Sequence, residues 1–437
     1  MKLNKKLTYT AVAMMGLFGL VGCGTDTSKT EELKVVTSIE TPVEVEFWHS
    51  MSGAFTDTIN EIVEDFNNTV GAEKNIHVEA VYQGGYTDAK AKVTASLKAG
   101  NSPEIVQGTV NDIMEYISSG YVQPLNDYIF NQEIGIKDFD DIYSVYRQES
   151  ASYLEGGKYY SLPFAKSTDL LFYNKTLFDE HGIEVPTTWD ELQAVSEKIT
   201  EITGKPALSI DNTANYLITM LMQKGAGYTN RQGELLFNNQ ESLDAMTLIQ
   251  ENTKAGIWRL AGEDGYSSYP FMAENTFMFI GSSAGEGFLN EDNFDWEATA
   301  LPQYDLENPK YIQQGNNIAI LNQNKTSEEV FGAYEFVKYL SSPEVNTKWA
   351  METGYLPIRE SVTKSEEYQE FIKDSTTKPN AVKSAENGFV ESIFVTDAGL
   401  SSNIVRQQVG LMVDEVVLGD ATPQDALDRY FEQLSNY

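Results

Sequence analysis

The chain has 437 residues, of which 41% are apolar, and its 24 Tyr, 21 Phe and 5 Trp suffice for sizeable cores and for more than one domain. Its formal net charge of −34 argues against nucleic acid or an anionic membrane surface as a partner. The single cysteine excludes an internal disulfide.

The N-terminal segment has the layout of a bacterial export signal. Three lysines in MKLNKK precede an uncharged apolar run, which ends at Gly22 and is too short to span a membrane comfortably. The next residue is Cys23, and LVGC resembles the bacterial lipobox. This resemblance implies a signal peptide over residues 1–22 and lipidation at Cys23; a thiol within a retained membrane anchor is the alternative. The polar residues 23–42 predict a flexible tether.

These features predict a location. We expect a protein on the extracellular face of the cell membrane, held by lipid on Cys23 as its only membrane contact. A Gram-positive surface is favoured, because a receptor without an outer membrane around it diffuses away unless tethered; a periplasmic location is the alternative.

The first half of the remaining chain alternates strands with helices. Strands are expected from alternating or short apolar runs at 43–49, 76–82 and 103–108. Helices are expected after each of them, at 52–67, 88–100 and 111–120. Such alternation predicts a parallel, doubly wound sheet.

The pattern then starts again in the second half. A long helix is expected at 186–204, where Thr188 and Glu191 form a capping box. Further strands are expected at 158–165, 170–178, 207–210, 276–283 and 316–323, and amphipathic helices at 328–342 and 422–434. Two α/β lobes are therefore predicted.

Polar and aromatic residues gather at the expected carboxyl ends of these strands, where open α/β sheets bind ligands. They are Trp48-His49-Ser50, Gly84-Gly85-Tyr86, Gln107-Gly108-Thr109, Lys166-Ser167-Thr168, Ser282-Ser283 and Gly315-Asn316-Asn317. Rings, hydroxyls and amides favour the binding of a polyol over catalysis. For each triplet alone, the alternative is a turn or a helix cap.

The sequence argues against an enzyme. Residues 281–285, GSSAG, match the G-x-S-x-G motif of α/β-hydrolases, which needs a histidine further along the chain. The only histidines, His49, His77 and His181, all precede it. No cluster of residues has metal-ligand spacing, and we expect no cofactor. A secreted glycan-degrading enzyme and a lipoprotein adhesin remain as remote alternatives.

Several motifs resemble family 1 extracellular solute-binding proteins of ABC importers, particularly the sn-glycerol-3-phosphate-binding branch. They are EFWHSMSG, GGYTDAKAKVTASLKAGNSPEIVQ, LPFAKSTDLLFYNKTLF, TTWDEL, TGYLPI and TPQDALD. The resemblance implies the α/β, two-lobed periplasmic-binding-protein fold, with a doubly wound sheet in each lobe and a multi-strand hinge. It also implies a monomer that performs no chemistry and delivers a small polar solute to the ABC permease subunits in the membrane.

The resemblance also implies where the lobes meet. The chain is expected to cross between them near Leu162–Lys166, Gly315–Ile318 and Ser342–Val345. Residues 43–162 and 318–345 would form the N-terminal lobe, and residues 163–317 and 346–437 the C-terminal lobe. The lobes would close on the solute about this hinge.

Position by position, the resemblance implies a set of solute contacts. It implies ligand-binding roles for Tyr86, Ser283 or its neighbour Ser282, Gly315, Tyr355 and Arg406, with Lys166 and Ser167 in place of a serine pair. The Arg406 fork suits a phosphate, although the side chain has Glu391 and Asp414 as alternative partners.

Two departures from the family pattern bear on the cargo. The family's glutamate falls at Thr109 and Val110, and its tryptophan pair falls around Thr213 and Tyr216. These smaller side chains leave room for a glycerophosphodiester as well as glycerol-3-phosphate. A neutral mono- or oligosaccharide is the alternative cargo.

Overall fold

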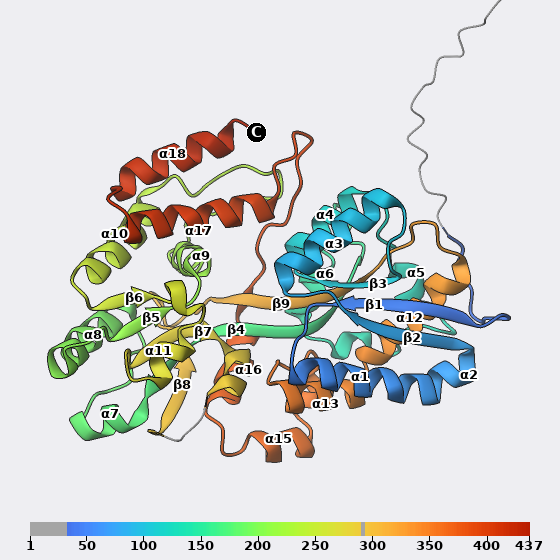
Figure 1. The fold of residues 1–437 in the computed structure, drawn as a ribbon, viewed down its shortest axis with the longest axis horizontal. Coiled ribbons are helices and arrows are strands. Elements are labelled where there is room, and N and C mark those ends of the chain that lie inside the picture. The colour runs from blue at the N-terminus through green and yellow to red at the C-terminus, as the bar shows by residue number, and fades with distance from the viewer. Residues whose placement is uncertain (1–32, 290–292) are drawn as a thin grey trace, which may run out of the picture. The chain divides into compact units, whose positions relative to one another are not determined.

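The computed structural model of the protein describes residues 33–289 and 293–437 (Figure 1). The predicted signal peptide, Cys23 and the tether as far as residue 32 lie outside the described residues. The described chain packs earlier than the predicted start at Val43, because Ile39 is buried and Leu33, Val35 and Val36 lie against the core. Within these ranges, every helix is too short or too polar to cross a bilayer.

Ten strands in the described ranges join into one hydrogen-bonded sheet of order β2-β1-β3-β9-β4-β7-β5-β6, with β10 beside β9 and β8 beside β4. The strands are β1 (Val43–His49), β2 (Ile76–Tyr82), β3 (Ile105–Gly108), β4 (Leu162–Asn174), β5 (Leu208–Ile210), β6 (Trp258–Leu260), β7 (Met278–Ser282), β8 (Trp296–Ala300), β9 (Tyr311–Ile320) and β10 (Gly388–Phe389).

Helices connect and cover these strands. The α-helices are α1 (Ala54–Phe66), α2 (Ala72–Lys74), α3 (Tyr86–Ala99), α4 (Val110–Ser118), α5 (Asn126–Ile129), α6 (Ser144–Ser150), α7 (Lys175–His181), α8 (Trp189–Thr203), α9 (Thr213–Gln223), α10 (Gln240–Lys254), α11 (Ser268–Met272), α12 (Ser327–Leu340), α13 (Pro343–Thr353), α14 (Glu360–Thr363), α15 (Glu366–Ile372), α16 (Thr377–Glu386), α17 (Ser402–Leu418) and α18 (Pro423–Ser435). Short 3-10 turns follow at η2 (Phe139–Asp141), η3 (Gly262–Asp264) and η4 (Ser283–Phe288), and a π-helical turn, η1 (Asn67–Gly71), extends α1.

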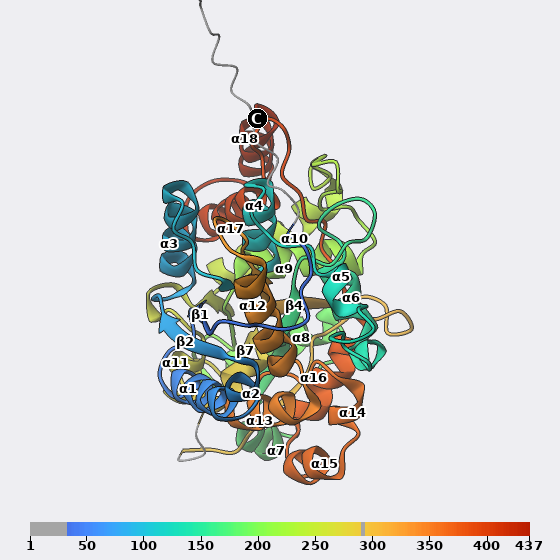
Figure 2. The ribbon, with the colours of Figure 1, turned by 90° about the vertical axis from the view of Figure 1, so that its right-hand side faces the viewer.

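The β1–β3 region is wound on both faces, as predicted. β1 pairs in parallel with β2 and with β3. Val45 and Phe47 pack into the core formed with α1 and α12, whereas Trp48 packs on the opposite face with residues of α3 and α4. Figure 2 shows α3 and α4 on one side of these strands and α1, α2 and α13 on the other. Side chains on opposite faces of β1 thus pack into two different cores, and the predicted strand at residues 43–49 is confirmed.

The β5–β7 region repeats the arrangement. β5 pairs in parallel with β6 and with β7. Residues of α8, α9, α10 and α17 form a second large core with these strands. The predicted capping box of α8 is present, since the Thr188 hydroxyl accepts the Glu191 N–H and the Glu191 carboxylate accepts the Thr188 N–H.

Two long antiparallel strands, β4 and β9, link these regions (Figure 1). One end of β9 pairs with β3, and one end of β4 pairs with β7. We expected two separate segments at 158–165 and 170–178, but the structure has one strand. All residues of β4 are buried, so the strand lacks the alternation that marks half-exposed strands. The strands lie where the first two crossings were predicted.

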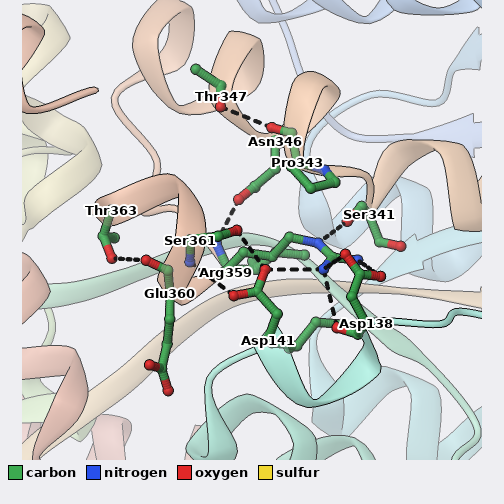
Figure 3. A network of polar contacts seen from close by, with 12 residues as sticks. Asp138, Asp141, Ser341, Pro343, Asn346, Thr347, Arg359, Glu360, Ser361 and Thr363 are labelled. Atoms are coloured by element: carbon green, nitrogen blue, oxygen red, sulfur yellow. Dashed lines mark hydrogen bonds and ion pairs between the residues drawn. The ribbon is translucent and has the colours of Figure 1, made fainter. Parts of the chain in front are cut away.

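The chain that follows the predicted third crossing, at residues 342–345, contacts α1 and the segment before α6. Helix α13 packs on α1, and Lys348 of α13 pairs with Glu61 of α1. Beyond α13, Arg359 donates to Asp138 and Asp141, which precede α6 (Figure 3). These contacts keep the chain with the β1–β3 region as far as Arg359. The predicted crossings and lobe boundaries remain predictions.

Candidate functional site

A cluster of two phenols and one amide lies beside the linking strands. The Tyr86 hydroxyl, at the first residue of α3, lies 3.3 Å from the Tyr355 hydroxyl and accepts a hydrogen bond of 3.3 Å from Asn316 Nδ2 on β9. Tyr86 is 49% exposed, whereas Tyr355 and Asn316 are buried. Residues 86, 316 and 355 are far apart in sequence, so the fold brings together predicted contacts Tyr86 and Tyr355.

Packing fixes the Tyr355 ring. It stacks on Trp349, with ring centroids 5.8 Å apart and an angle of 13°, and it contacts Phe55 at 5.7 Å. Burial, together with the neighbouring Tyr86 hydroxyl, raises the pKa of Tyr355 well above its usual value. The phenol therefore stays protonated at neutral pH and remains a hydrogen-bond donor.

The predicted serines lie along β4 and β7. Ser283 is buried, and its Oγ accepts the Thr168 N–H at 3.3 Å. Ser282 caps η4 by accepting the Ala284 N–H. Ser167 is buried on β4, opposite Gln314 of β9. Thus Ser283 and Ser282 each serve a backbone group, which is compatible with a structural role as well as with solute binding.

Gly315 allows the close approach of β4 and β9. Its φ is +100°, and a Cβ at this position would lie 1.9 Å from the Ala165 carbonyl oxygen. This contact alone requires glycine. The predicted role of Gly315 as a backbone donor to solute stays a prediction.

Lys166 has a partner inside the protein. Its ammonium group pairs with the Glu149 carboxylate and lies 5.5 Å from the centre of the Tyr146 ring. Both Lys166 and Glu149 are buried. A solute would have to compete with Glu149 for this cation, so the proposed contribution of Lys166 to solute binding is weakened.

Arg406, on α17, joins a polar network that crosses three segments. Its Nη1 donates to both oxygens of Glu391, at 2.6 and 2.8 Å, and its Nη2 donates to Asn215 Oδ1. Asn215 Nδ2 donates in turn to Asp169 Oδ2 on β4 at 2.8 Å, and Gln314 donates to the other oxygen of Asp169. Of the two alternative partners named for Arg406, Glu391 is the one found.

Asp169 is the buried acid of this network. Burial raises its pKa to about 6, and the nearby Asp211 adds to this effect; hydrogen bonds from Asn215 and Gln314 and the charge of Arg406 oppose it. Gln314 immediately precedes Gly315 and Asn316 on β9, so one strand connects this network to the tyrosine cluster.

A cleft of roughly 480 Å³ lies beside Arg406, within the usual size range of small-molecule sites. Its walls come from the start of α9, the turn after β6 and one side of α17. The lining residues are Asp211, Asn212, Thr213, Ala214, Leu260, Ala261, Gly262, Gly265, Asn403, Arg406, Gln407, Gly410, Leu411, Asp414 and Leu418. This mixture of carboxylates, amides and apolar groups suits a solute with hydroxyl groups.

Three other predicted contacts form hydrogen bonds within the protein, and a fourth, His49, is buried. Thr109 caps α4 in a capping box with Asp112. The Tyr216 hydroxyl donates to the Ala245 carbonyl from inside the second core. Trp48 donates to Glu46 and lies against the α3–α4 core, and His49 is buried beside Phe47 and Tyr82.

Sequence reasoning missed several residues of the site. Asp169 lies within the motif LPFAKSTDLLFYNKTLF, and Asp211 and Asn215 lie beside the positions where the family's tryptophan pair falls, but no role was predicted for any of them or for Gln314. Residues 33–289 and 293–437 contain no group of three or more His, Cys, Asp or Glu side chains able to hold a metal.

Comparisons with known proteins place this arrangement in a family. The family described as bacterial extracellular solute-binding protein matches residues 61–376, more than half of the chain. The sn-glycerol-3-phosphate-binding periplasmic protein of Escherichia coli (strain K12) is 25% identical over 452 aligned residues, covering 98% of this chain and 97% of that protein. The same protein of Yersinia pseudotuberculosis is 25% identical over 408 residues, covering 88% and 90%.

Solved structures share the fold. UgpB from Mycobacterium tuberculosis, in complex with glycerophosphocholine, superposes with a TM-score of 0.77 at 18% identity, covering 90% of this chain and 98% of that one. The GacH receptor of Streptomyces glaucescens, solved with and without acarbose, gives 0.75 at 19% identity, covering 91% and 98%. These similarities confirm the predicted two-lobed periplasmic-binding-protein fold. The chain belongs to the family of bacterial extracellular solute-binding proteins.

Proposed function

We propose that this protein is the substrate-binding component of an ABC importer. It captures a small polyhydroxylated solute between its two lobes, acts as a monomer, performs no chemistry and delivers the solute to the permease subunits. The observation that carries this proposal is the convergence of Tyr86, Tyr355, Asn316 and the Arg406 network on the linking strands β4 and β9. Closure about these strands would enclose the solute.

The N-terminal sequence supports a location for the protein at the cell membrane. The lipobox-like LVGC implies attachment by lipid on Cys23 to the extracellular face of the membrane, and a Gram-positive surface suits a tethered receptor. An anchored receptor stays near its permease. Mass spectrometry of the membrane fraction tests this step: lipid on Cys23 is expected, and an unmodified Cys23 in the mature protein would contradict it.

Glycerol-3-phosphate or a glycerophosphodiester is one class of cargo. Arg406 lies in the wall of the cleft, and the relatives at 25% identity bear the name of a glycerol-3-phosphate-binding protein. The guanidinium fork is well suited to a phosphate group.

A neutral mono- or oligosaccharide is the second class. Arg406 Nη1 already donates to both carboxylate oxygens of Glu391, and two further carboxylates, Asp211 and Asp414, line the cleft. Carboxylates accept hydrogen bonds from sugar hydroxyls and repel anions.

Isothermal titration of glycerol-3-phosphate, glycerophosphodiesters and oligosaccharides, with the wild type and with Arg406→Ala, tests the proposal. At least one of these solutes is expected to bind, and Arg406→Ala is expected to weaken its binding by about tenfold or more, because the substitution removes a donor from the cleft wall. For a phosphorylated solute the loss should exceed that for a neutral one. If no polyhydroxylated solute binds the folded wild type, the proposed function is wrong.

A further inference from the structure

The Arg406 fork is occupied by a partner from the same chain. Glu391 lies in the segment between β10 and α17, and both of its carboxylate oxygens accept from Arg406 Nη1. The Arg406 and Glu391 side chains are 21% and 14% exposed, so water screens this pair only partly. On its other side Arg406 donates to Asn215, which Asp169 holds in place. An incoming anion would have to replace Glu391.

The surroundings of Arg406 are acidic. Among the described residues that line the cleft, the charged side chains are Asp211, Asp414 and Arg406. Asp211 accepts the Ser267 N–H at 2.5 Å, and Asp414 accepts the Thr213 hydroxyl at 2.8 Å. These partners are neutral and do not compensate a negative charge. Burial raises the pKa of both Asp211 and Asp414 above the usual value of a carboxyl group. With Glu391 paired to Arg406, the walls of the cleft carry a net negative charge.

This charge balance discriminates between cargo classes. Like charges repel, and the repulsion is screened less in a partly buried site than in bulk water, so a phosphate beside these carboxylates meets substantial repulsion. A phosphate that displaces Glu391 also leaves that carboxylate partly buried without its partner. A neutral polyol meets neither cost, and its hydroxyls can donate to the carboxylates in charge-assisted hydrogen bonds.

We propose that the cleft beside α17 takes an uncharged polyhydroxylated solute, and that Glu391 is the specificity-determining residue that neutralises Arg406 and selects against phosphate. This inference rests on the proposed function and chooses between its two cargo classes. Glu391 acts through Arg406: with the carboxylate in place, the guanidinium orients neutral groups, and without it the guanidinium becomes an anion site.

Glu391→Gln tests the inference, because it removes one charge and keeps the size of the side chain. Titrations at low salt use three probes: inorganic phosphate, glycerol-3-phosphate and maltotriose. The wild type is expected to bind neither phosphate probe more tightly than maltotriose. In Glu391→Gln, affinity for glycerol-3-phosphate relative to the wild type should rise by about tenfold or more, because a fixed negative charge next to the guanidinium is gone.

Glu415→Gln is the matched control. This substitution also removes one charge and breaks an arginine–glutamate pair, between Glu415 and Arg429. Arg429 does not line the cleft, whereas Arg406, the partner of Glu391, does. This control should leave phosphate binding unchanged. An equal gain in both variants, no gain in Glu391→Gln, or a wild type that prefers glycerol-3-phosphate would overturn the inference.

Two further outcomes remain decisive. If the wild type binds no polyhydroxylated solute, the proposed function is wrong. The role of Glu391 is then tested by inorganic phosphate alone: tighter phosphate binding by Glu391→Gln supports it, and unchanged phosphate binding refutes it. If Glu391→Gln does not fold, Asp414→Asn replaces it, since it lowers the charge of the cleft without touching Arg406. A severalfold gain in phosphate affinity is then expected, and no gain would refute the inference.

Discussion

Arg359 and Arg406 are both largely withdrawn from water and both paired with carboxylates, yet they differ in what surrounds them. Arg359 is 1% exposed, and its guanidinium donates to the Ser341 carbonyl and to Asp138 and Asp141 (Figure 3). Ser361 donates to Asp141 as well, so the second carboxylate is also held. Arg406 pairs with one carboxylate and one amide, and it forms part of a cleft wall.

The difference predicts a structural role for Arg359 and supports the proposed contact between Arg406 and solute. The Arg359 network joins the start of α14 to the segment before α6, and its groups find their partners within the protein. Arg406 is held by Glu391 and Asn215 but borders open space, where a solute can reach it. A polar side chain should therefore affect stability when the protein encloses it, and solute binding when it borders the cleft.

Replacing Arg359 should give the largest effect. Arg359→Met leaves Asp138 and Asp141 without their cation and is expected to cost about 3 kcal/mol of unfolding free energy, because the pair is buried on the arginine side and partly exposed on the other. Urea unfolding followed by tryptophan fluorescence measures this cost. Lys364→Met, which breaks the exposed pair with Glu360, should cost no more than about 0.5 kcal/mol. If Arg359→Met is as stable as the wild type but binds the solute more weakly, Arg359 acts in binding and the proposed difference from Arg406 is wrong.

His49 provides a second, pH-dependent test. Burial lowers its pKa to about 4, although the nearby Met51 backbone partly opposes the shift. The unfolded chain takes up this proton near pH 6.5, so stability is lost as the pH falls from 6.5 towards 4. By pH 5 the loss should be about 2 kcal/mol relative to pH 7.

The titration of Asp169 offsets part of this pH-dependent loss of stability. Its pKa is raised to about 6, so its contribution to stability is lost as the pH rises through 6 and is regained on acidification. The test is therefore a difference: wild type minus His49→Phe, each unfolded in urea at pH 7 and pH 5. We expect the variant to lose about 2 kcal/mol less than the wild type between these pH values. Equal losses would show that His49 is not held neutral by burial.

Much of the fold was predictable because its signals are local. Residues 43–49 and 76–82 alternate or end at turns, and the structure has strands over the same residues. Thr188 and Glu191 are three residues apart, so their capping box is visible in sequence. β4 was predicted in two parts because its polar centre, Lys166 to Asp169, interrupts an apolar run. Only Glu149 and the neighbouring strands explain why these residues are buried.

The site was less predictable because its contacts join residues that are far apart in the sequence. Asn215 meets Asp169 across 46 positions and Arg406 across 191, and these contacts exist only after distant segments of the chain pack together. Residue types at strand ends identified Tyr86 and the Gly315 region, but they could not tell a residue that borders the cleft from one that faces the core. Tyr216 illustrates this, since its hydroxyl is used inside the protein.

Thr109→Ala is expected to have a smaller effect on stability than Arg359→Met, and it distinguishes a capping role of Thr109 from a role in solute binding. The Thr109 hydroxyl accepts the Asp112 N–H at 3.2 Å, and Asp112 accepts the Thr109 N–H in return. The side chain therefore has its hydrogen-bond partner within the protein, although it lies at a strand end. Thr109→Ala should cost about 1 kcal/mol of unfolding free energy and leave solute affinity unchanged, as should Thr188→Ala at the equivalent position of α8. Titration of the solute bound by the wild type distinguishes the two roles. If Thr109→Ala lowers the affinity for that solute by more than the Thr188→Ala control does, the Thr109 hydroxyl contacts the solute, as the sequence suggested. A residue that caps a helix at this edge of the sheet could then also bind solute.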